Sequence, residues 1–505
     1  MSDPATRRLW IGIPGPELDP ETRATLDEVR PGGIVLFRRN VASIEAVKRL
    51  IADLHELLGD ELILSVDHEG GLVTRFHEEL TVFPGNMALG AAAFREPSMG
   101  EHLALEQGLW SARELRDLGF HVNLSPVLDL ATLGDNPGIT IRSFGAPAAL
   151  ATQLGVAMVR GTQRGGIHAT LKHFPGKGHA TVDAHIDLPV IPDADQEPHL
   201  VPFRACIEEG ASCVMTSHVV YKAIDAERPA TFSRAVVSDL LREELGFRGV
   251  VVSDDLEMGA MQRHHAFDDI VRGVCAAGHD ALCIAHDPAL HRRAAQLLRD
   301  AYASGEEWYG DAEAIEERLA ALRPLDPTGA PDMSKARSIA EAISGRAITI
   351  IRDDHGLIPL ATEGEVVLGM PTLRSETGVE DPLRGEEDAS ALVDALRPTI
   401  TLRLPTEPAA DDIASLLQAA QGKTLVLALT NARFLEAQRL LAQRCVETHS
   451  RVIVLLLRNP FDAQVLEGRK ATIVASYGFR PMQLDALAQV VRGETQPYGM
   501  LPIEL

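Results

Sequence analysis

Short apolar runs and amphipathic stretches alternate along the first part of the chain. Eight runs of β-branched and aliphatic residues end at Gly, Pro or a polar cluster, as buried strands do. Helical patterns lie between them, and those over 43–59, 102–119 and 148–166 stop at glycine, a common helix terminator. Eight alternations of strand and helix predict an α/β fold, a TIM-like (β/α)8 barrel. The predicted strands cover residues 9–15, 32–37, 62–67, 120–129, 168–174, 213–220, 249–255 and 281–286.

The chain has 505 residues, more than the roughly 250 that one such barrel needs. A helical pattern near 311–323 leads into RPLDPTGAPDMSK, whose Pro and Gly content is typical of a joining segment. Nearly continuous apolar strands follow, which predict a sheet covered on both faces. We therefore predict a barrel over 1–325, a joining segment over 326–345 and an α/β sandwich over 346–505. Its predicted strands cover 346–353, 365–370, 424–430, 451–459 and 472–478, and its predicted helices 411–422, 433–445 and 481–493.

Composition excludes several classes of partner. Hydrophobic residues are 45% of the chain and charged residues 24%, and no apolar run approaches the roughly 20 residues that span a bilayer. The net charge of −24 repels nucleic acid. Five scattered cysteines, an odd number, favour reduced thiols, and the N-terminus lacks the apolar core of a signal peptide. We expect a cytoplasmic protein that binds neither nucleic acid nor membranes.

Polar residues close five of the eight predicted strands. In a barrel of this kind the active site lies at the C-terminal ends of the strands. A single aspartate at a strand end often caps a helix or forms a turn, but five strands ending in this way are typical of a shared pocket. The residues are Asp67, Asp129, Lys172 with His173, Ser217 with His218, and Asp254 with Asp255.

The segment from Lys172 to His185 is the densest polar stretch. Its Pro and Gly residues exclude regular structure, so it should form a long loop over the pocket. Asp183 and His185 are two residues apart, a spacing that lets the carboxylate bind one imidazole nitrogen while the other nitrogen donates a proton. A solvated polar loop is the alternative interpretation of these residues.

Metal and nucleotide sites find no support in the sequence. The histidines between 168 and 185 fit no structural zinc spacing, and the charge of Lys172 beside His173 would oppose a cation. The glycines form neither a P-loop nor a dinucleotide-binding motif. We expect no metal and no cofactor.

Four segments taken together resemble the two-domain β-N-acetylglucosaminidases of glycoside hydrolase family 3. The resemblance covers the barrel in order and extends more weakly into the second unit, through RAITIIRDDHGLIPL and PYGMLPIEL. The loop ending in Asp-x-His marks the N-acetylglucosaminidase branch; in the family's β-glucosidases the acid/base is a glutamate from the second domain. The four segments are SVDHEGGLVTRF, NPGITIRSFG, LKHFPGKGHATVDAH and GVVVSDDLEMGAM.

The resemblance implies a role for each matching residue. Asp254 would be the nucleophile and His185 the general acid/base, oriented by Asp183; the residues alone leave Asp254 and Asp255 undistinguished. The chain departs from the family pattern at His68, Leu72 and Lys177, which puts its substrate preference in question. The residues that would hold the terminal sugar are Asp67, Arg75, Arg142, Lys172 and His173.

These roles imply a retaining exo-hydrolase that removes terminal β-linked N-acetylglucosamine from small glycosides, such as cell-wall muropeptide fragments being recycled. A histidine acid/base does not repel phosphate, and Lys177 and His179 lie nearby, so a phosphorylase of the same glycosides is an alternative. A β-glucosidase or β-xylosidase is another. A non-catalytic sugar-binding protein is disfavoured because Asp183, His185 and Asp254 are all present. The second unit offers no catalytic candidate, and the oligomeric state is not predicted.

Overall fold

The computed structural model describes residues 3–77, 79–192, 195–326, 329–361, 364–373, 380 and 387–505, with the backbone alone for 387–389. Eight parallel strands form the first sheet, in the order β11-β9-β7-β6-β3-β2-β1-β12. A bridge between Val252 and Ala281 brings the two edge strands together, so the barrel is nearly closed. This confirms the predicted barrel. Its strands are β1 (Leu9–Gly12), β2 (Gly33–Leu36), β3 (Ile63–Val66), β6 (Val122–Asn123), β7 (His168–Phe174), β9 (Cys213–Thr216), β11 (Val250–Ser253) and β12 (Leu282–Ile284).

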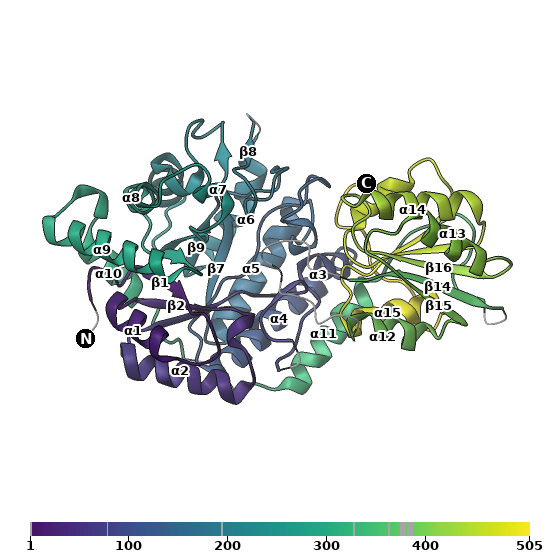
Figure 1. Ribbon diagram of the computed structural model, residues 1–505, viewed down its shortest axis with the longest axis horizontal. Helices are drawn as coiled ribbons and strands as arrows, with labels where there is room; N and C mark the ends of the chain where they lie inside the picture. The colour runs from purple at the N-terminus through teal and green to yellow at the C-terminus, as the bar shows by residue number, and fades with distance from the viewer. Residues whose placement is uncertain are drawn as a thin grey trace.

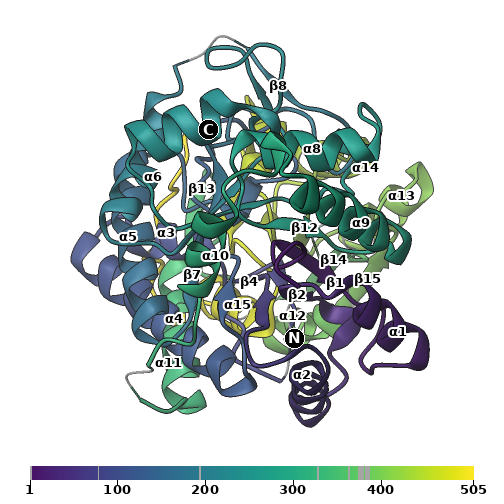
Figure 2. The ribbon, with the colours of Figure 1, turned by 90° about the vertical axis from the view of Figure 1, so that its left-hand side faces the viewer.

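Helices surround the barrel strands as a ring (Figure 2). In α2 the Ser43 hydroxyl accepts a hydrogen bond from the Ala46 N–H (3.2 Å) at the start, and Gly59 (φ 100°) follows the end. Val47 and Leu54 lie on the face of α2 that packs against the strands. The outer helices are α1 (Pro20–Val29), α2 (Ile44–Leu58), α4 (Pro97–Leu118), α5 (Ala148–Arg164), α6 (Glu197–Glu208), the π-helix η4 (Ala235–Glu244), α8 (Phe267–Ala277) and α9 (Pro288–Ser304).

Shorter elements decorate the barrel. They include a small hairpin after β3 and a buried helix, α3, beside the second unit (Figure 1). These elements are β4 (His68–Gly70), β5 (Val73–Thr74), α3 (Asn86–Ala93), β8 (Val190–Ile191), β10 (Val220–Tyr221), α7 (Gly259–Gln262), α10 (Ala312–Ala320) and the 3-10 turns η1 (Arg38–Asn40), η2 (Thr140–Arg142), η3 (Ala230–Phe232) and η5 (Glu307–Tyr309).

The second unit is a six-stranded sheet with helices on its faces, as predicted (Figure 1). Its strand order is β13-β18-β17-β16-β14-β15, parallel except for β13. The edge strand β15 was not predicted. The strands are β13 (Thr349–Asp353), β14 (Val366–Pro371), β15 (Ile400–Leu404), β16 (Thr424–Leu429), β17 (Val452–Leu456) and β18 (Thr472–Ala475). The helical elements are α12 (Glu387–Leu396), α13 (Ala410–Ala419), α14 (Glu436–Thr448), the 3-10 helix η6 (Pro460–Leu466) and α15 (Pro481–Val491).

Helix α11 (Met333–Ala347) joins the two sheets, so much of the predicted joining segment is helical. The exact boundaries of the units stay a prediction. Among the described residues, none of the helices has both the length and the apolar character needed to cross a membrane.

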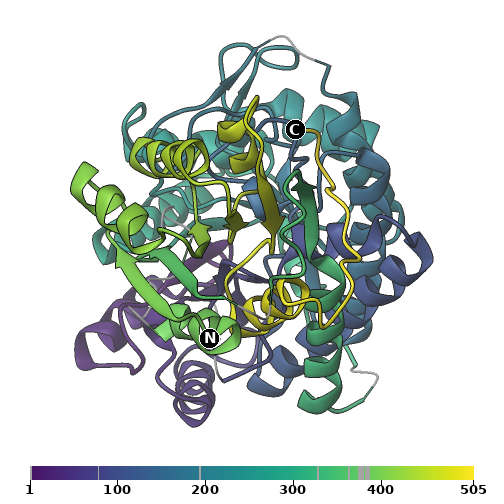
Figure 3. The same ribbon diagram turned by 90° about the vertical axis from the view of Figure 1, so that its right-hand side faces the viewer.

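The two units are held together by specific contacts. After α15 the last residues run in extended form back along the barrel helices (Figure 3), and Ala146 N–H donates to the Pro502 carbonyl (2.8 Å). Gly145 (φ 147°) has no room for a side chain, because an added Cβ would lie 2.4 Å from the Pro502 oxygen. Arg433 in the second unit also binds Asp135 in the barrel (2.7 Å).

Candidate active site

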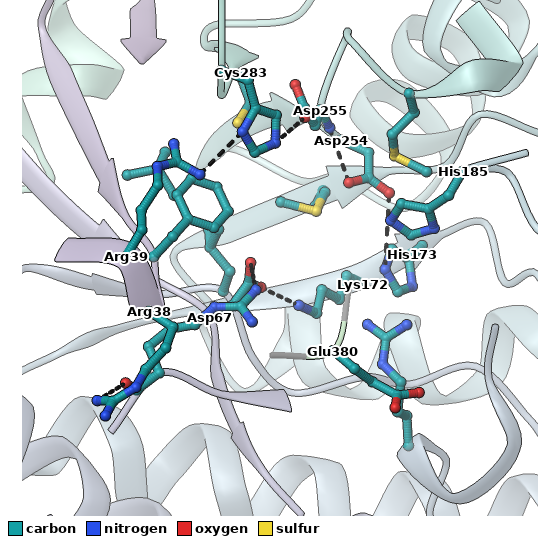
Figure 4. A pocket seen from close by; sticks show the side chains of 18 of the residues that line it. Arg38, Arg39, Asp67, Lys172, His173, His185, Asp254, Asp255, Cys283 and Glu380 are labelled. Atoms are coloured by element: carbon teal, nitrogen blue, oxygen red, sulfur yellow. Dashed lines mark hydrogen bonds and ion pairs between the residues drawn. The ribbon is translucent and has the colours of Figure 1, made fainter. Parts of the chain in front are cut away.

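A cavity of about 530 Å³ lies at the C-terminal ends of the barrel strands (Figure 4). It brings together all the residues predicted to contact or attack the sugar; Asp183 lies behind His185. Residues that were not predicted also line it, among them Arg38, Arg39, His286 and Glu380. The predicted residues on its wall are Asp67, Arg75, Arg142, Lys172, His173, His185 and Asp254.

A buried cluster of alternating charges forms one wall. Lys172 Nζ lies 2.6 Å from both Asp67 Oδ1 and Glu69 Oε1, and Arg142 binds Glu69 through two nitrogens at 2.7 and 3.0 Å. Arg75 Nη2 lies 3.3 Å from Asp67 Oδ2. Burial alone would raise the pKa of Asp67, but Lys172 and Arg75 outweigh it and lower the pKa to about 2. The cluster therefore offers charged donors and acceptors in fixed positions, suited to sugar hydroxyls.

Glu69 was not among the predicted site residues, although it holds both Lys172 and Arg142. It lies in the hairpin that follows β3, where Gly70 (φ 88°) and Gly71 (φ 59°) turn the backbone sharply. A Cβ on Gly70 would lie 2.9 Å from the Phe83 oxygen, so the close approach requires glycine. An acidic residue directly before two glycines was the available sequence signal.

Asp254 and Asp255 follow β11 but lie in different surroundings. Burial raises the pKa of Asp254, but Lys177, His218 and His185 together lower it below its ordinary value. Burial and the neighbouring Glu257 instead raise the pKa of Asp255 to about 8. At pH 7, therefore, Asp254 is ionised and Asp255 is mostly protonated.

His173 lies between Asp129 and Asp254. Its Nδ1 is 2.7 Å from Asp129 Oδ2, and its Nε2 is 3.9 Å from Asp254 Oδ2. Burial and the positive charge of Lys177 hold the pKa of His173 well below its ordinary value, so the imidazole is neutral. With Nδ1 donating to Asp129, Nε2 is an acceptor that faces the cavity.

His185 lies at the same end of the cavity as Asp254 (Figure 4) and forms a hydrogen-bonded pair with Asp183. Asp183 Oδ1 lies 2.7 Å from His185 Nδ1 and also accepts from the His185 backbone N–H (3.0 Å). Burial opposes the charge on Asp183, but its hydrogen bonds with His185 lower its pKa to about 2. The ionised carboxylate fixes the tautomer with hydrogen on Nδ1, so protonation places the second hydrogen on Nε2.

The loop that carries this pair is irregular, as predicted, and packs closely on the barrel. The Asn136 side-chain amide donates to the Lys177 carbonyl (2.8 Å), and a Cβ on Gly178 would lie 2.1 Å from the Leu130 oxygen. Asp129, Ser217 and His218 were also predicted to converge here, but they do not line the cavity. Asp129 holds His173, and His218 Nε2 lies 2.9 Å from the Asp255 carbonyl oxygen.

Comparison with known proteins identifies the family of this chain. Residues 10–320 match the model for the glycosyl hydrolase family 3 N-terminal domain. The chain is 36% identical over 339 residues to a beta-hexosaminidase from Thiobacillus denitrificans, which covers 66% of this chain and 90% of the relative. The structure of a glycoside hydrolase family 3 beta-N-acetylglucosaminidase from Paenibacillus superposes with a TM-score of 0.90 at 32% identity, covering 99% of this chain and 98% of that one. NagZ from Neisseria gonorrhoeae, solved with N-trifluoroacetyl-D-glucosamine, gives a TM-score of 0.57 at 31% identity over 67% of this chain and 96% of its own. The chain therefore belongs to glycoside hydrolase family 3.

Proposed function

We propose that this protein is a retaining, exo-acting β-N-acetylglucosaminidase that hydrolyses terminal β-linked N-acetylglucosamine from small glycosides. The observation that carries the proposal is an ionised carboxylate and a carboxylate-bound histidine at one end of a single sugar-sized cavity. The relatives named beta-hexosaminidase and beta-N-acetylglucosaminidase support the same substrate class.

In the proposed mechanism Asp254 attacks the anomeric carbon while protonated His185 donates its Nε2 proton to the departing glycosidic oxygen. The product of this step is a glycosyl-enzyme ester on Asp254. His185 then removes a proton from water as the water attacks the anomeric carbon, which releases the sugar and regenerates the Asp254 carboxylate. Two displacements at one carbon give net retention.

The environments of the two neighbouring carboxyls support Asp254 as the nucleophile. A nucleophile must be ionised at working pH, which the cations around Asp254 favour. Asp255 is held as a neutral acid, and its Oδ1 accepts hydrogen bonds from the backbone N–H groups of Ala285 (3.1 Å) and Glu257 (3.2 Å). Asp255 is therefore suited to holding the strand ends in place.

The charge cluster supports a role for Asp67, Arg75, Arg142, Lys172 and His173 in holding the terminal sugar. Ion pairs with one another or with Glu69 hold the first four residues, and a hydrogen bond to Asp129 holds His173, so little reorganisation is needed when a sugar binds. The ligand is proposed to be neutral and hydroxyl-rich, because the cluster offers both donors and acceptors.

A panel of p-nitrophenyl glycosides tests the proposal. We expect turnover of the β-N-acetylglucosaminide to exceed that of the β-glucoside and β-xyloside by at least about 10-fold, because a site built for specific hydrogen bonds rejects sugars that leave buried groups unpaired. Repeating the assay with phosphate and searching for sugar 1-phosphate tests the phosphorylase alternative. No turnover of any glycoside would overturn the proposal.

A role in recycling muropeptide fragments in the cytoplasm is the finer part of the proposal. The five cysteines are free and buried in the described chain, which fits a reducing compartment. Release of N-acetylglucosamine from a purified disaccharide muropeptide, compared with chitobiose, measures whether the cell-wall fragment is the preferred substrate.

A further inference from the structure

The start of helix α15, in the second unit, contacts two backbone carbonyls of the barrel. Arg480, the residue before α15, donates from Nε to the Gly71 carbonyl (3.2 Å), and Gln483 donates from Nε2 to the Pro84 carbonyl (3.2 Å). Both side chains are buried. An added Cβ on Gly478, between β18 and α15, would lie 2.2 Å from Gln483 Oε1, so only glycine leaves room there for the glutamine side chain.

The first of these carbonyls belongs to the hairpin that carries Glu69. Glu69 Oε1 lies 2.6 Å from Lys172 Nζ, and both of its oxygens bind Arg142. Lys172 and Arg142 line the cavity, whereas Glu69 lies behind them as their shared partner. The position of the hairpin therefore sets the position of two cations that a bound sugar would meet.

Two glycines follow Glu69 and make the hairpin dependent on its surroundings. Gly70 and Gly71 have no side chains to pack, so hydrogen bonds of the backbone must hold the turn in place. The Gly71 N–H donates to the Phe83 oxygen (2.7 Å) within the barrel, and its carbonyl accepts from Arg480 in the second unit. The second unit thus supplies one of the two hydrogen bonds at this glycine.

The second carbonyl leads to the same pair of cations. Two residues after Pro84, the Asn86 side-chain amide donates to the Arg142 carbonyl (2.8 Å). Gln483 therefore holds the segment that supports the backbone of Arg142, while Arg480 holds the turn that supports its guanidinium through Glu69. Two separate routes connect the start of α15 with the sugar site.

We propose that Arg480 and Gln483 are positioning residues that place the sugar-binding cations of the barrel. The proposal rests on the proposed glycosidase function and deepens it, because it gives the second unit a part in binding the terminal sugar. Neither residue lines the cavity, so both act through the barrel segments that they hold.

The test compares Arg480→Met with Arg480→Gln. Glutamine places an N–H donor as many bonds from the backbone as Arg480 Nε, and methionine has the same length without a donor. Both variants lose the guanidinium end alike, so the difference between them reports the hydrogen bond to Gly71.

The kinetic constants for p-nitrophenyl β-N-acetylglucosaminide give the first measurement. We expect Arg480→Met to raise KM, and the inhibition constant of free N-acetylglucosamine, by about 5-fold, the equivalent of one ordinary hydrogen bond. Arg480→Gln should raise both by less than about twofold, because it keeps the donor. The kcat should stay within about twofold in both variants, because Asp254 and His185 lie on other segments.

A purely structural role would lower the thermal unfolding midpoint and leave the inhibition constant unchanged. The control, Asp135→Ala, removes another ion pair between the units, Arg433–Asp135, in which Asp135 is 66% exposed; it should change neither KM nor the inhibition constant. Gln483→Glu keeps the oxygen that accepts from the Arg480 N–H (3.3 Å) but loses the donor to Pro84, so it should also raise the inhibition constant.

Two results would overturn the proposal. One is KM and inhibition constants within about twofold of wild type in folded Arg480→Met, which is less than one hydrogen bond is worth. The other is an equal rise in Arg480→Met and Arg480→Gln. If Arg480→Met does not fold, the inhibition constant of Gln483→Glu decides, and an unchanged value contradicts the proposal.

Wild-type turnover separates this proposal from the proposed function. If the wild type hydrolyses no glycoside, the function fails, and calorimetric dissociation constants for N-acetylglucosamine replace the kinetic constants. Weaker binding by Arg480→Met than by Arg480→Gln would then support the positioning role. Equal binding, or none by any of the proteins, would contradict it.

Discussion

Replacing Lys172 by methionine would remove the central cation of the buried charge cluster. Lys172 Nζ lies 2.6 Å from both Asp67 and Glu69, and its side chain is 2% exposed. Methionine has a similar length but leaves the two carboxylates with only Arg75 and Arg142 as partners. Removing one member of a buried ion pair costs about 3–5 kcal/mol, so we expect the free energy of unfolding near neutral pH to fall by about that amount.

The loss should depend on pH in a defined direction. In the wild type the pKa of Asp67 is about 2 against an ordinary 3.8. This difference corresponds to about 2.5 kcal/mol of stability, present above pH 4 and lost as pH falls through 2. Without Lys172, burial favours the protonated form of Asp67, so Asp67 takes up a proton when the chain folds. The free-energy cost of this protonation falls by about 1.4 kcal/mol for each unit by which the pH is lowered. The destabilisation should therefore be smaller at pH 5 than at pH 8.

Urea unfolding of both proteins at pH 5 and pH 8 measures this difference. Arg160→Met is the control, because the Arg160–Glu209 pair is more exposed and should contribute less than about 1 kcal/mol at either pH. If Lys172→Met lowers the free energy of unfolding by less than about 1 kcal/mol, or by the same amount at both pH values, the argument that the buried carboxylates cause the destabilisation is refuted.

Three further substitutions test other parts of the account. Asp183→Asn should lower kcat/KM by about 10²-fold or more for glycosides with poor leaving groups, and less for nitrophenyl glycosides, because these need less protonation by His185; equal losses for both would contradict the role of Asp183. In Asp255→Asn the titrating group is lost. The pKa of Asp255 in the folded protein, about 8, exceeds its ordinary value of 3.8, so Asp255 makes the wild type less stable as pH rises from about 4 to 8. The stability of the variant relative to the wild type should therefore rise over that range. A difference that does not change between pH 5 and pH 8 in urea unfolding would contradict this. Gly145→Ala should lower the thermal unfolding midpoint, because its Cβ would lie 2.4 Å from the Pro502 oxygen, whereas Gly345→Ala in α11 meets nothing within 4 Å and should not lower it; equal midpoints would contradict the packing argument.

The barrel was predictable because each strand is a short apolar run closed by polar residues. The predicted runs extend past several observed strands: β3 ends at Val66, for example, and Asp67 already belongs to the cavity. Strand β15 (Ile400–Leu404) was not predicted. Exposure alternates along this strand at the edge of the sheet, and its two exposed positions carry a hydroxyl or a charge, so the sequence shows no continuous apolar run there. A half-exposed edge strand carries a weaker apolar signal than a buried one.

The site was predictable only in part, because its electrostatics depend on partners far apart in sequence. Asp254 and Asp255 are adjacent, yet Lys177 lowers the pKa of one and Glu257 raises the pKa of the other. Glu380 gave no local signal, since its ion pair with Arg458 exists only when the second sheet has formed. The Asp183–His185 pair, by contrast, is local and was visible in the spacing of the loop.

Turnover of p-nitrophenyl β-N-acetylglucosaminide by Asp254→Asn tests the central claim, that Asp254 is the nucleophile, most directly. The account predicts a fall in kcat of about 10³-fold or more with an unchanged thermal unfolding midpoint, because an amide cannot form the glycosyl-enzyme ester. Asp255→Asn, the matched neighbour, should keep most of its turnover. Wild-type turnover by Asp254→Asn would contradict the account.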